Sequence, residues 1–237
     1  MGKVAILMVH GFAGGIYDFE DLANHLELNR KYDVFVYTLP GHAKNLSKSK
    51  YTEWVEKSEE KLNFLIDNGY KNIYVIGHSM GGIIASYLAS KYKEVKKLVL
   101  AAPGFHYLNV KNTDIDLTDN LKLLPKLIDE YGHNEVISRF LKLNITALGE
   151  FVKLNKEYYN CPSNITCKVL LLQGLKDDLV PSSSSEYVYN TVKSKLKKLV
   201  YFKNENHNLL RDKNKEEIFS IIDKFLKHDK KGGIYNL

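Results

Sequence analysis

The sequence predicts an α/β fold with a mostly parallel six-stranded sheet flanked by helices, and with a small helical cap inserted between two strands. Short apolar runs alternate with longer amphipathic segments, which is the order expected of parallel strands joined by right-handed crossovers. The runs do not alternate polar and apolar residues, and this is typical of strands buried on both faces of a sheet. Residues 104–167 interrupt the rhythm without a strand signal, and this interruption predicts the cap.

Each core element is predicted from a local pattern. The six strands are short aliphatic and β-branched runs at residues 4–9, 34–37, 73–76, 98–101, 169–172 and 199–202. Between them, apolar residues fall near helical spacing, as Val55, Leu62 and Leu65 do in the segment that Tyr51 opens. The predicted helices cover 17–28, 51–68, 80–91, 182–193 and 213–229, and the serine run 182–185 offers N-cap candidates for the fourth.

The cap divides the chain into two predicted parts. Residues 1–103 and 168–237 form the core, and residues 104–167 form the cap, with helical patterns near 118–130, 134–144 and 145–158. A structureless loop of this length is improbable in a compact domain. Inserted at the carboxyl ends of the strands, the cap would cover the edge at which open α/β sheets bind ligands. The alternative is that these helices only fill out the fold.

Composition argues against several classes of protein. No stretch approaches the roughly 20 apolar residues that span a bilayer, and no secretory leader is recognised, so we expect a cytoplasmic protein without a membrane span. Cys161 and Cys167 are too few for a disulfide framework and are expected as free thiols. The net charge of +6 comes almost entirely from lysine, and no dense basic block interleaved with aromatic residues indicates nucleic-acid binding. The oligomeric state is not indicated.

The motif Gly77-His78-Ser79-Met80-Gly81 lies between a predicted strand and a predicted helix. A G-x-S-x-G sequence is a weak signal alone, but in this context it predicts a nucleophile elbow. The turn would strain the backbone of Ser79, and Gly77 and Gly81 supply the small neighbours that such a turn needs. It would also expose the hydroxyl near the positive end of a helix. Ser79 is therefore the candidate nucleophile, and the alternative is a glycine-rich turn with a passive serine.

A serine nucleophile needs a general base and an orienting carboxylate. For an elbow of this kind the chain order is serine, acid, histidine. His207 lies in the loop after the last predicted strand and is the candidate base. The acid should follow the strand at 169–172, where Asp177 and Asp178 stand side by side and either could serve.

The remaining requirement is a pair of backbone N–H donors for the oxyanion. One should be the N–H of Met80, directly after the nucleophile, and the other should come from the loop after the first strand, at Phe12. That loop reads His10-Gly11-Phe12-Ala13-Gly14-Gly15, which lacks the spacing of either common nucleotide-binding motif, so we expect no nucleotide site.

Taken together, these motifs resemble the α/β-hydrolase superfamily, and within it the small bacterial carboxylesterases and monoacylglycerol lipases. The matching stretches span nearly the whole chain in the family's order; they are His10-Gly11-Phe12, Leu39-Pro40-Gly41-His42, Gly77-His78-Ser79-Met80-Gly81-Gly82, Gly174-Leu175-Lys176-Asp177-Asp178-Leu179-Val180-Pro181 and Asn206-His207. The resemblance implies the α/β-hydrolase fold and places Asp177, three residues after Gly174, at the position of the acid. Gly41-His42-Ala43-Lys44 departs from the family pattern, which often has a second glycine after the histidine.

The function that the resemblance implies is hydrolysis of carboxylic esters with short- to medium-chain acyl groups, through an acyl-enzyme on Ser79. It implies a small-molecule ester as the partner and requires no cofactor or metal. A serine nucleophile argues against the epoxide hydrolases and dehalogenases of the superfamily, which have an aspartate there. Thioesterase, acyltransferase, perhydrolase and non-catalytic ligand-binding functions remain alternatives on the same fold.

The acyl pocket is expected under the cap. Residues 103–108 leave the core beside the nucleophile and carry the large apolar side chains of Phe105, Tyr107 and Leu108. With Leu124 and Leu148 of the predicted cap helices, these side chains are expected to form an apolar pocket above Ser79.

Overall fold

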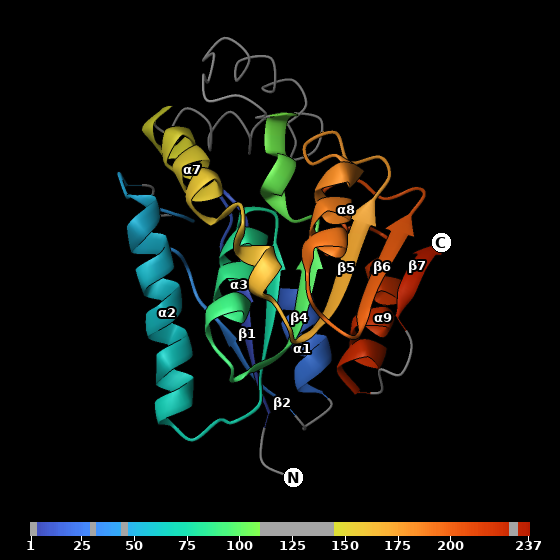
Figure 1. Cartoon of the computed structure of the whole chain (residues 1–237), viewed down its shortest axis with the longest axis horizontal. Helices are drawn as coiled ribbons and strands as arrows, with labels where there is room; N and C mark the ends of the chain where they lie inside the picture. Colours follow the sequence, from blue (N-terminus) through green and yellow to red (C-terminus); the bar gives the residue numbers. More distant parts are fainter. Residues whose placement is uncertain (1–3, 29–31, 44–46, 110–144, 228–231) are drawn as a thin grey trace.

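Seven parallel strands form the sheet of the computed structural model, which describes residues 4–28, 32–43, 47–109, 145–227 and 232–237. In chain order the strands are β1 (Val4–Val9), β2 (Tyr32–Val36), β3 (Ile73–His78), β4 (Val95–Ala101), β5 (Lys168–Gly174), β6 (Lys197–Phe202) and β7 (Gly233–Asn236). They lie in the order β2-β1-β3-β4-β5-β6-β7 (Figure 1). The strand order changes direction between β1 and β3, so the crevice beyond their carboxyl ends is the place where such a sheet binds ligands.

All six predicted strands are confirmed, but the six-stranded count was one too low because β7 was missed. β7 has four residues, and three of them are exposed at the edge of the sheet beside β6. It therefore carries neither a buried apolar run nor a polar–apolar alternation long enough to be recognised. The prediction of a parallel sheet is confirmed at every pairing.

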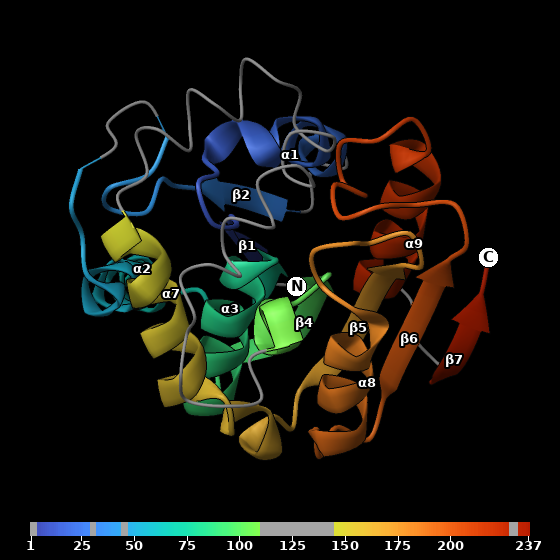
Figure 2. The ribbon, with the colours of Figure 1, turned by 90° about the horizontal axis from the view of Figure 1, so that it is seen from above.

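The helices cover both faces of the sheet, as Figure 2 shows from above. One face packs against α1 (Glu20–Glu27) and α9 (Lys215–Lys227), and the other against α2 (Tyr51–Asp67), α3 (Met80–Lys91) and α8 (Ser182–Thr191). Along β1, Ile6 and Met8 join the first of these cores, whereas Leu7 and Val9 join the second. Both faces of the strand are thus apolar, and this is why its sequence shows no alternation.

The five predicted core helices are confirmed, with differences at their ends. A short 3₁₀ turn, η1 (Ile16–Asp18), precedes α1, which therefore begins later than predicted. The prediction that a serine caps α8 is wrong, because Pro181 occupies the N-cap. The hydroxyls of two of these serines turn inward instead: Ser184 donates to the carbonyl of Pro103, and Ser185 donates to the Gln173 side chain at 2.7 Å.

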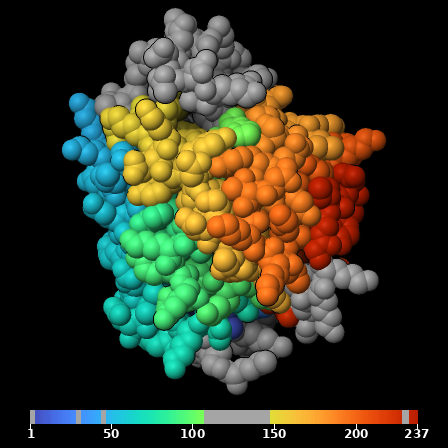
Figure 3. Space-filling model, viewed as in Figure 1, coloured from blue at the N-terminus to red at the C-terminus, as the bar shows by residue number. Residues whose placement is uncertain are grey.

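The described part of the cap segment consists of η2 (Gly104–Asn109), α7 (Ile145–Tyr158) and η3 (Cys161–Asn164). The predicted helix 145–158 is confirmed as α7, while those at 118–130 and 134–144 lie outside the described residues. The space-filling view shows α7 (yellow) on the surface between α2 (blue) and α8 (orange) (Figure 3). The boundaries of the cap stay a prediction.

Hydrogen bonds tie α7 to the start of α2 and to η2. Glu150 accepts the backbone N–H of Tyr51 at the start of α2, at 3.1 Å. The side-chain amide of Asn155 donates to the carbonyls of Gly104 and Phe105, at 2.8 and 3.0 Å. The helix is thereby fixed against α2 and against η2, which follows β4. Within the described ranges, no helix has the length and apolar character that crossing a membrane requires.

Candidate active site

Ser79 occupies the single position between the end of β3 and the start of α3. Its backbone is strained, with φ 52° and ψ −121°, a conformation that a residue with a side chain adopts only when its surroundings impose it. The surroundings here are hydrogen bonds: the Ser79 N–H donates to Ala101 in β4, and the Ser79 carbonyl accepts the N–H groups of Gly82 and Gly104. The predicted elbow geometry is confirmed.

The glycines on either side of Ser79 are required by close packing. A Cβ on Gly77 would lie 2.6 Å from the Cβ of Ala85 on the first turns of α3. A Cβ on Gly81 would overlap the carbonyl oxygen of Val9 at the end of β1. Because backbone cannot give way as a flexible side chain can, only glycine fits at these positions.

The structure brings Asp177 and His207 together from two loops that follow neighbouring strands, β5 and β6. The Nδ1 of His207 donates to the Oδ2 of Asp177 at 2.8 Å, and their side chains are only 2% and 0% exposed. Asp178 is exposed. Because a carboxylate only accepts, this contact places the ring proton of neutral His207 on Nδ1, which leaves the lone pair on Nε2.

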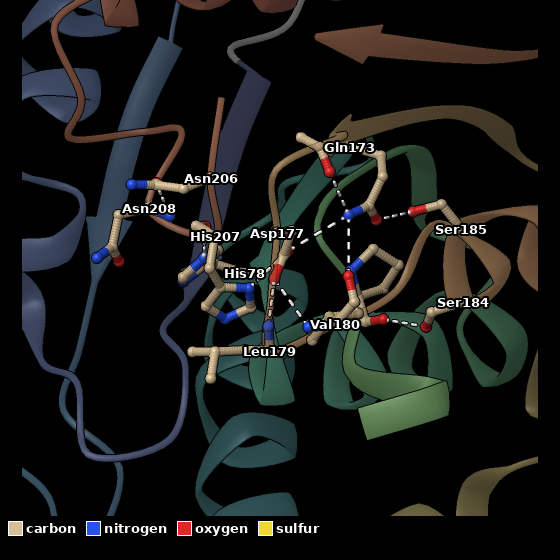
Figure 4. Close-up of polar contacts among 12 residues, drawn as sticks. His78, Gln173, Asp177, Leu179, Val180, Ser184, Ser185, Asn206, His207 and Asn208 are labelled. Carbon is tan, nitrogen blue, oxygen red and sulfur yellow. Dashed lines mark hydrogen bonds and ion pairs between the residues drawn. The ribbon is translucent and has the colours of Figure 1, made fainter. Parts of the chain in front are cut away.

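Four donors hold the Asp177 carboxylate (Figure 4). Its Oδ1 accepts the N–H groups of Leu179 and Val180 at 2.9 and 2.8 Å, and its Oδ2 also accepts the Gln173 amide at 3.3 Å. Burial alone would raise the pKa of Asp177, but the charge of His207 and these hydrogen bonds outweigh burial, so the pKa lies below its ordinary value. The aspartate is therefore held ionised and in one orientation.

His78, the residue before Ser79, supports His207 rather than reacting itself. Its Nε2 donates to the backbone carbonyl of His207 at 3.0 Å, and the two rings lie 4.9 Å apart. Burial, reinforced by the neighbouring His207, lowers the pKa of His78 to about 3, so the ring is neutral.

Phe12 lies in a tight turn after β1, directly beside the elbow. The turn is closed by the N–H of Gly14, which donates to the carbonyl of Gly11 at 3.1 Å, and Ala13 takes a positive φ of 58° within it. Gly11 lies against the candidate nucleophile, since a Cβ there would be 3.1 Å from the Cβ of Ser79. The Phe12 ring stacks on Phe151 of α7 at 5.7 Å.

A cleft opens between this turn, the elbow and the loop after His207. Residues from all three segments line it: Gly11, Phe12, Gly14, Asp18, His78, Ser79, Asn208, Leu210 and Arg211. The second predicted oxyanion donor, Met80, is the first residue of α3, and its nitrogen lies close to Gly104. Ser79, Phe12 and the His207 loop thus meet at one place at the carboxyl edge of the sheet.

The predicted acyl pocket is only partly visible. Phe105 is buried and packs against the rings of Tyr159 and Tyr187, at 6.4 and 5.7 Å. Leu148 is partly buried on α7 and packs against the larger core. Tyr107 and Leu108 belong to η2, but their side chains, like all of Leu124, lie outside the described part. The pocket stays a prediction.

Sequence reasoning missed the supporting residues of this site. His10 is completely buried at the end of β1, Gln173 joins Asp177 to Ser185, and Phe151 packs on Phe12. The only sequence signal was position, because His10 and Gln173 each stand at the carboxyl end of a strand that leads into a candidate loop. Among the described residues, no cluster of three or more His, Cys, Asp or Glu side chains is placed to hold a metal ion.

Comparison with known families gives two matches. A family model described as "alpha/beta hydrolase fold" matches residues 4–131, and one described as "Serine aminopeptidase, S33" matches residues 109–214. The first model covers more than half of the chain and includes both Phe12 and Ser79.

Several of the similar proteins are bacterial esterases and lipases. The chain is 24% identical to a thermostable monoacylglycerol lipase of Bacillus sp. (strain H-257), over 96% of this chain and 92% of that protein. It is 22% identical to a carboxylesterase of Bacillus subtilis, over 95% and 93%. Among solved structures, a metagenome-derived lipolytic enzyme superposes with a TM-score of 0.75 at 18% identity, covering 96% of this chain and 95% of the other.

Proposed function

The chain belongs to the α/β-hydrolase family, with distant relatives among bacterial esterases and lipases, and from this premise we propose that it is a serine esterase. In this proposal Ser79, His207 and Asp177 cleave carboxylic esters with short- to medium-chain acyl groups through an acyl-enzyme. The observation that carries the proposal is the buried contact between His207 and Asp177 beside a serine held in a strained turn. This combination matches what a serine nucleophile needs for activation.

The first step is proton transfer and attack. The Nε2 of His207 would take the proton of Ser79 as its Oγ attacks the ester carbonyl carbon, and the ring would become an imidazolium. The ionised Asp177 stabilises that cation through the hydrogen bond at Nδ1. His207 then returns the proton to the leaving alcohol, and water hydrolyses the acyl-enzyme by the same route in reverse.

The tetrahedral intermediate places a negative charge on the former carbonyl oxygen. In the proposal this oxyanion accepts the backbone N–H groups of Phe12 and Met80, one from the turn after β1 and one from the start of α3. A donor of this kind contributes about 3–4 kcal/mol of transition-state stabilisation in other serine hydrolases. The first turn of α3 adds a favourable dipole at the same place.

Substrate preference belongs to the proposal as well. The similar proteins include a monoacylglycerol lipase and a carboxylesterase, which supports a small ester as the substrate. Phe12 and Leu148 are partly buried apolar residues on either side of the buried Phe151 of α7, which supports an acyl chain on that side. Thioester hydrolysis and acyl transfer would use the same three residues, so the acceptor and the acyl donor must be found by assay.

The proposal predicts that a fluorophosphonate adds one covalent group, which mass spectrometry locates on the peptide containing Ser79. Replacement Ser79→Ala should abolish both the labelling and the hydrolysis of p-nitrophenyl and glyceryl esters, while circular dichroism and thermal unfolding stay unchanged. Ser183, which is exposed on the first turn of α8, provides the matched control, since Ser183→Ala should keep both the labelling and the ester hydrolysis. Labelling that survives Ser79→Ala would overturn the assignment, and acyl-CoA turnover without ester turnover would redirect it to a thioesterase.

A further inference from the structure

The side chain of His10 makes two hydrogen bonds that connect the segments following β1 and β2. Its Nε2 accepts the backbone N–H of Leu39 at 3.0 Å, in the segment that follows β2. Its Nδ1 lies 2.8 Å from the carbonyl oxygen of Gly11, the next residue in the chain. The ring is completely buried.

These two partners fix the tautomer of His10. The Leu39 N–H can only donate and the Gly11 carbonyl can only accept, so Nε2 carries the lone pair and Nδ1 carries the proton. Burial, with the neighbouring His42, lowers the pKa of His10 to about 3, so the ring remains neutral in this state near neutral pH. A charged ring could not accept from Leu39.

The carbonyl that His10 binds belongs to the same peptide group as the Phe12 N–H. A peptide group is planar and trans, so its C=O and N–H point in opposite directions, and fixing one fixes the other. Two donors fix this carbonyl, the ring of His10 and the N–H of Gly14. The Phe12 N–H therefore points away from His10 and from the Gly14 N–H. Because Gly11 lies against Ser79, this N–H lies next to the candidate nucleophile.

We propose that His10 is a positioning residue for the oxyanion hole, acting through the Gly11–Phe12 peptide group. The inference rests on the proposed function, because the Phe12 N–H matters only if an oxyanion forms at Ser79. His10 does not touch substrate. Its Nδ1–H holds the Gly11 carbonyl and with it the orientation of one donor, so that no reorganisation is needed when charge develops; the Leu39 N–H selects the tautomer that carries this proton.

Two substitutions separate the two hydrogen bonds of His10. His10→Asn places an amide N–H near the position of Nδ1 and can keep the bond to Gly11, but it cannot reach Leu39. His10→Gln places an acceptor near the position of Nε2 and can keep the bond to Leu39, but it loses the donor to Gly11. A purely structural role for His10 would make the two variants equivalent, or would favour His10→Gln.

The two variants are expected to differ in kcat. His10→Gln should lower kcat on a short-chain ester about 10- to 100-fold, approaching the loss of one oxyanion donor, while KM changes little. His10→Asn should stay within about threefold of the wild type in kcat. Binding of a boronic acid, which forms a tetrahedral adduct on serine, should weaken in His10→Gln in proportion to kcat/KM. Equal activity of the two variants, a larger loss in His10→Asn, or an effect confined to KM would overturn the proposal.

A measurement on the wild-type protein keeps the test decisive if the variants fail to fold. Long-range ¹H–¹⁵N NMR of the histidine rings should show His10 neutral with its proton on Nδ1. A proton on Nε2 would overturn this inference whatever the enzyme's activity. By contrast, a wild-type protein that hydrolyses no ester and is not labelled at Ser79 would overturn the proposed function, with the NMR result unaffected.

Discussion

At the scale of single residues, Asp177 and Asp178 are chemically identical but lie in opposite environments. Asp177 is buried against His207 and accepts hydrogen bonds from four donors, whereas Asp178 is exposed. The sequence alone left either residue possible, and only the resemblance favoured Asp177. The structure brings Asp177, not its neighbour, to the histidine.

The two aspartates therefore predict very different mutant kinetics. Asp177→Asn keeps the size of the side chain but presents an amide to His207, which disfavours the Nδ1–H tautomer. We expect kcat to fall by about 10⁴-fold, as the corresponding change does in serine proteases. Asp178→Asn, the matched control, should leave kcat within about threefold because its side chain faces solvent. Steady-state kinetics on one p-nitrophenyl ester measures both, and similar losses in the two variants would contradict the assignment.

At the scale of elements, the features of the site differ in how far apart in the sequence the residues that determine them lie. The elbow could be predicted because its turn, its glycines and its serine lie within five residues, between a strand and a helix that are each recognisable. The order of acid and base could be predicted because each follows an apolar strand. The role of His10 could not, because it depends on Leu39 and on a tautomer that only the assembled loops define. The edge strand β7 could not either, since it buries too little to show a pattern.

Helix α7 of the predicted cap contacts the turn that carries Phe12, and this contact predicts an effect on chain-length preference. Leu148 lies one turn before Phe151, which stacks on Phe12. Replacement Leu148→Trp adds bulk at the base of the proposed acyl pocket, so activity should fall more for long acyl chains than for acetyl esters. We expect kcat/KM for a long-chain ester to drop at least about tenfold relative to the acetate ester, which corresponds to about 1.4 kcal/mol.

Lys156, exposed on the same helix, provides the control for this substitution. Lys156→Trp introduces the same side chain away from Phe12, and the chain-length profile should match that of the wild type. A panel of p-nitrophenyl esters of increasing acyl length measures the effect. An unchanged profile in Leu148→Trp would mean that α7 does not shape the acyl site.

At the scale of the whole molecule, the two apolar cores on either side of the sheet hold the polar groups of the site in fixed places. The sheet brings the ends of β1, β3, β5 and β6 to one edge, and the segments that follow these strands supply Phe12, Ser79, Asp177 and His207. This convergence places His10 and His78 inside the protein, buried and hydrogen-bonded as neutral rings. The same burial that fixes their orientation makes both residues unfavourable to protonate in the folded state.

This burial predicts how stability depends on pH. The pKa of both His10 and His78 is lowered to about 3 in the folded protein, against about 6.5 for an unperturbed histidine. Between these values the unfolded chain binds protons that the folded protein does not, so the free energy of unfolding falls as the pH falls. Each histidine should contribute a slope of about 1.4 kcal/mol per pH unit below pH 6.5, and Asp177 should add to the loss only below its unfolded pKa of about 3.9.

The test is urea unfolding of the wild type and of His10→Asn at several pH values between about 6.5 and 4, the interval in which His10 is expected to titrate only when unfolded. His10→Asn removes one titrating ring, so its free energy of unfolding should fall with a slope about 1.4 kcal/mol per pH unit shallower than that of the wild type. Every other ionisable group is common to the two proteins, so the difference between the slopes isolates His10. Equal slopes would mean that His10 accepts a proton in the folded state. The ring could then no longer accept the Leu39 N–H, which would contradict the hydrogen bond on which the assignment of the proton to Nδ1 rests.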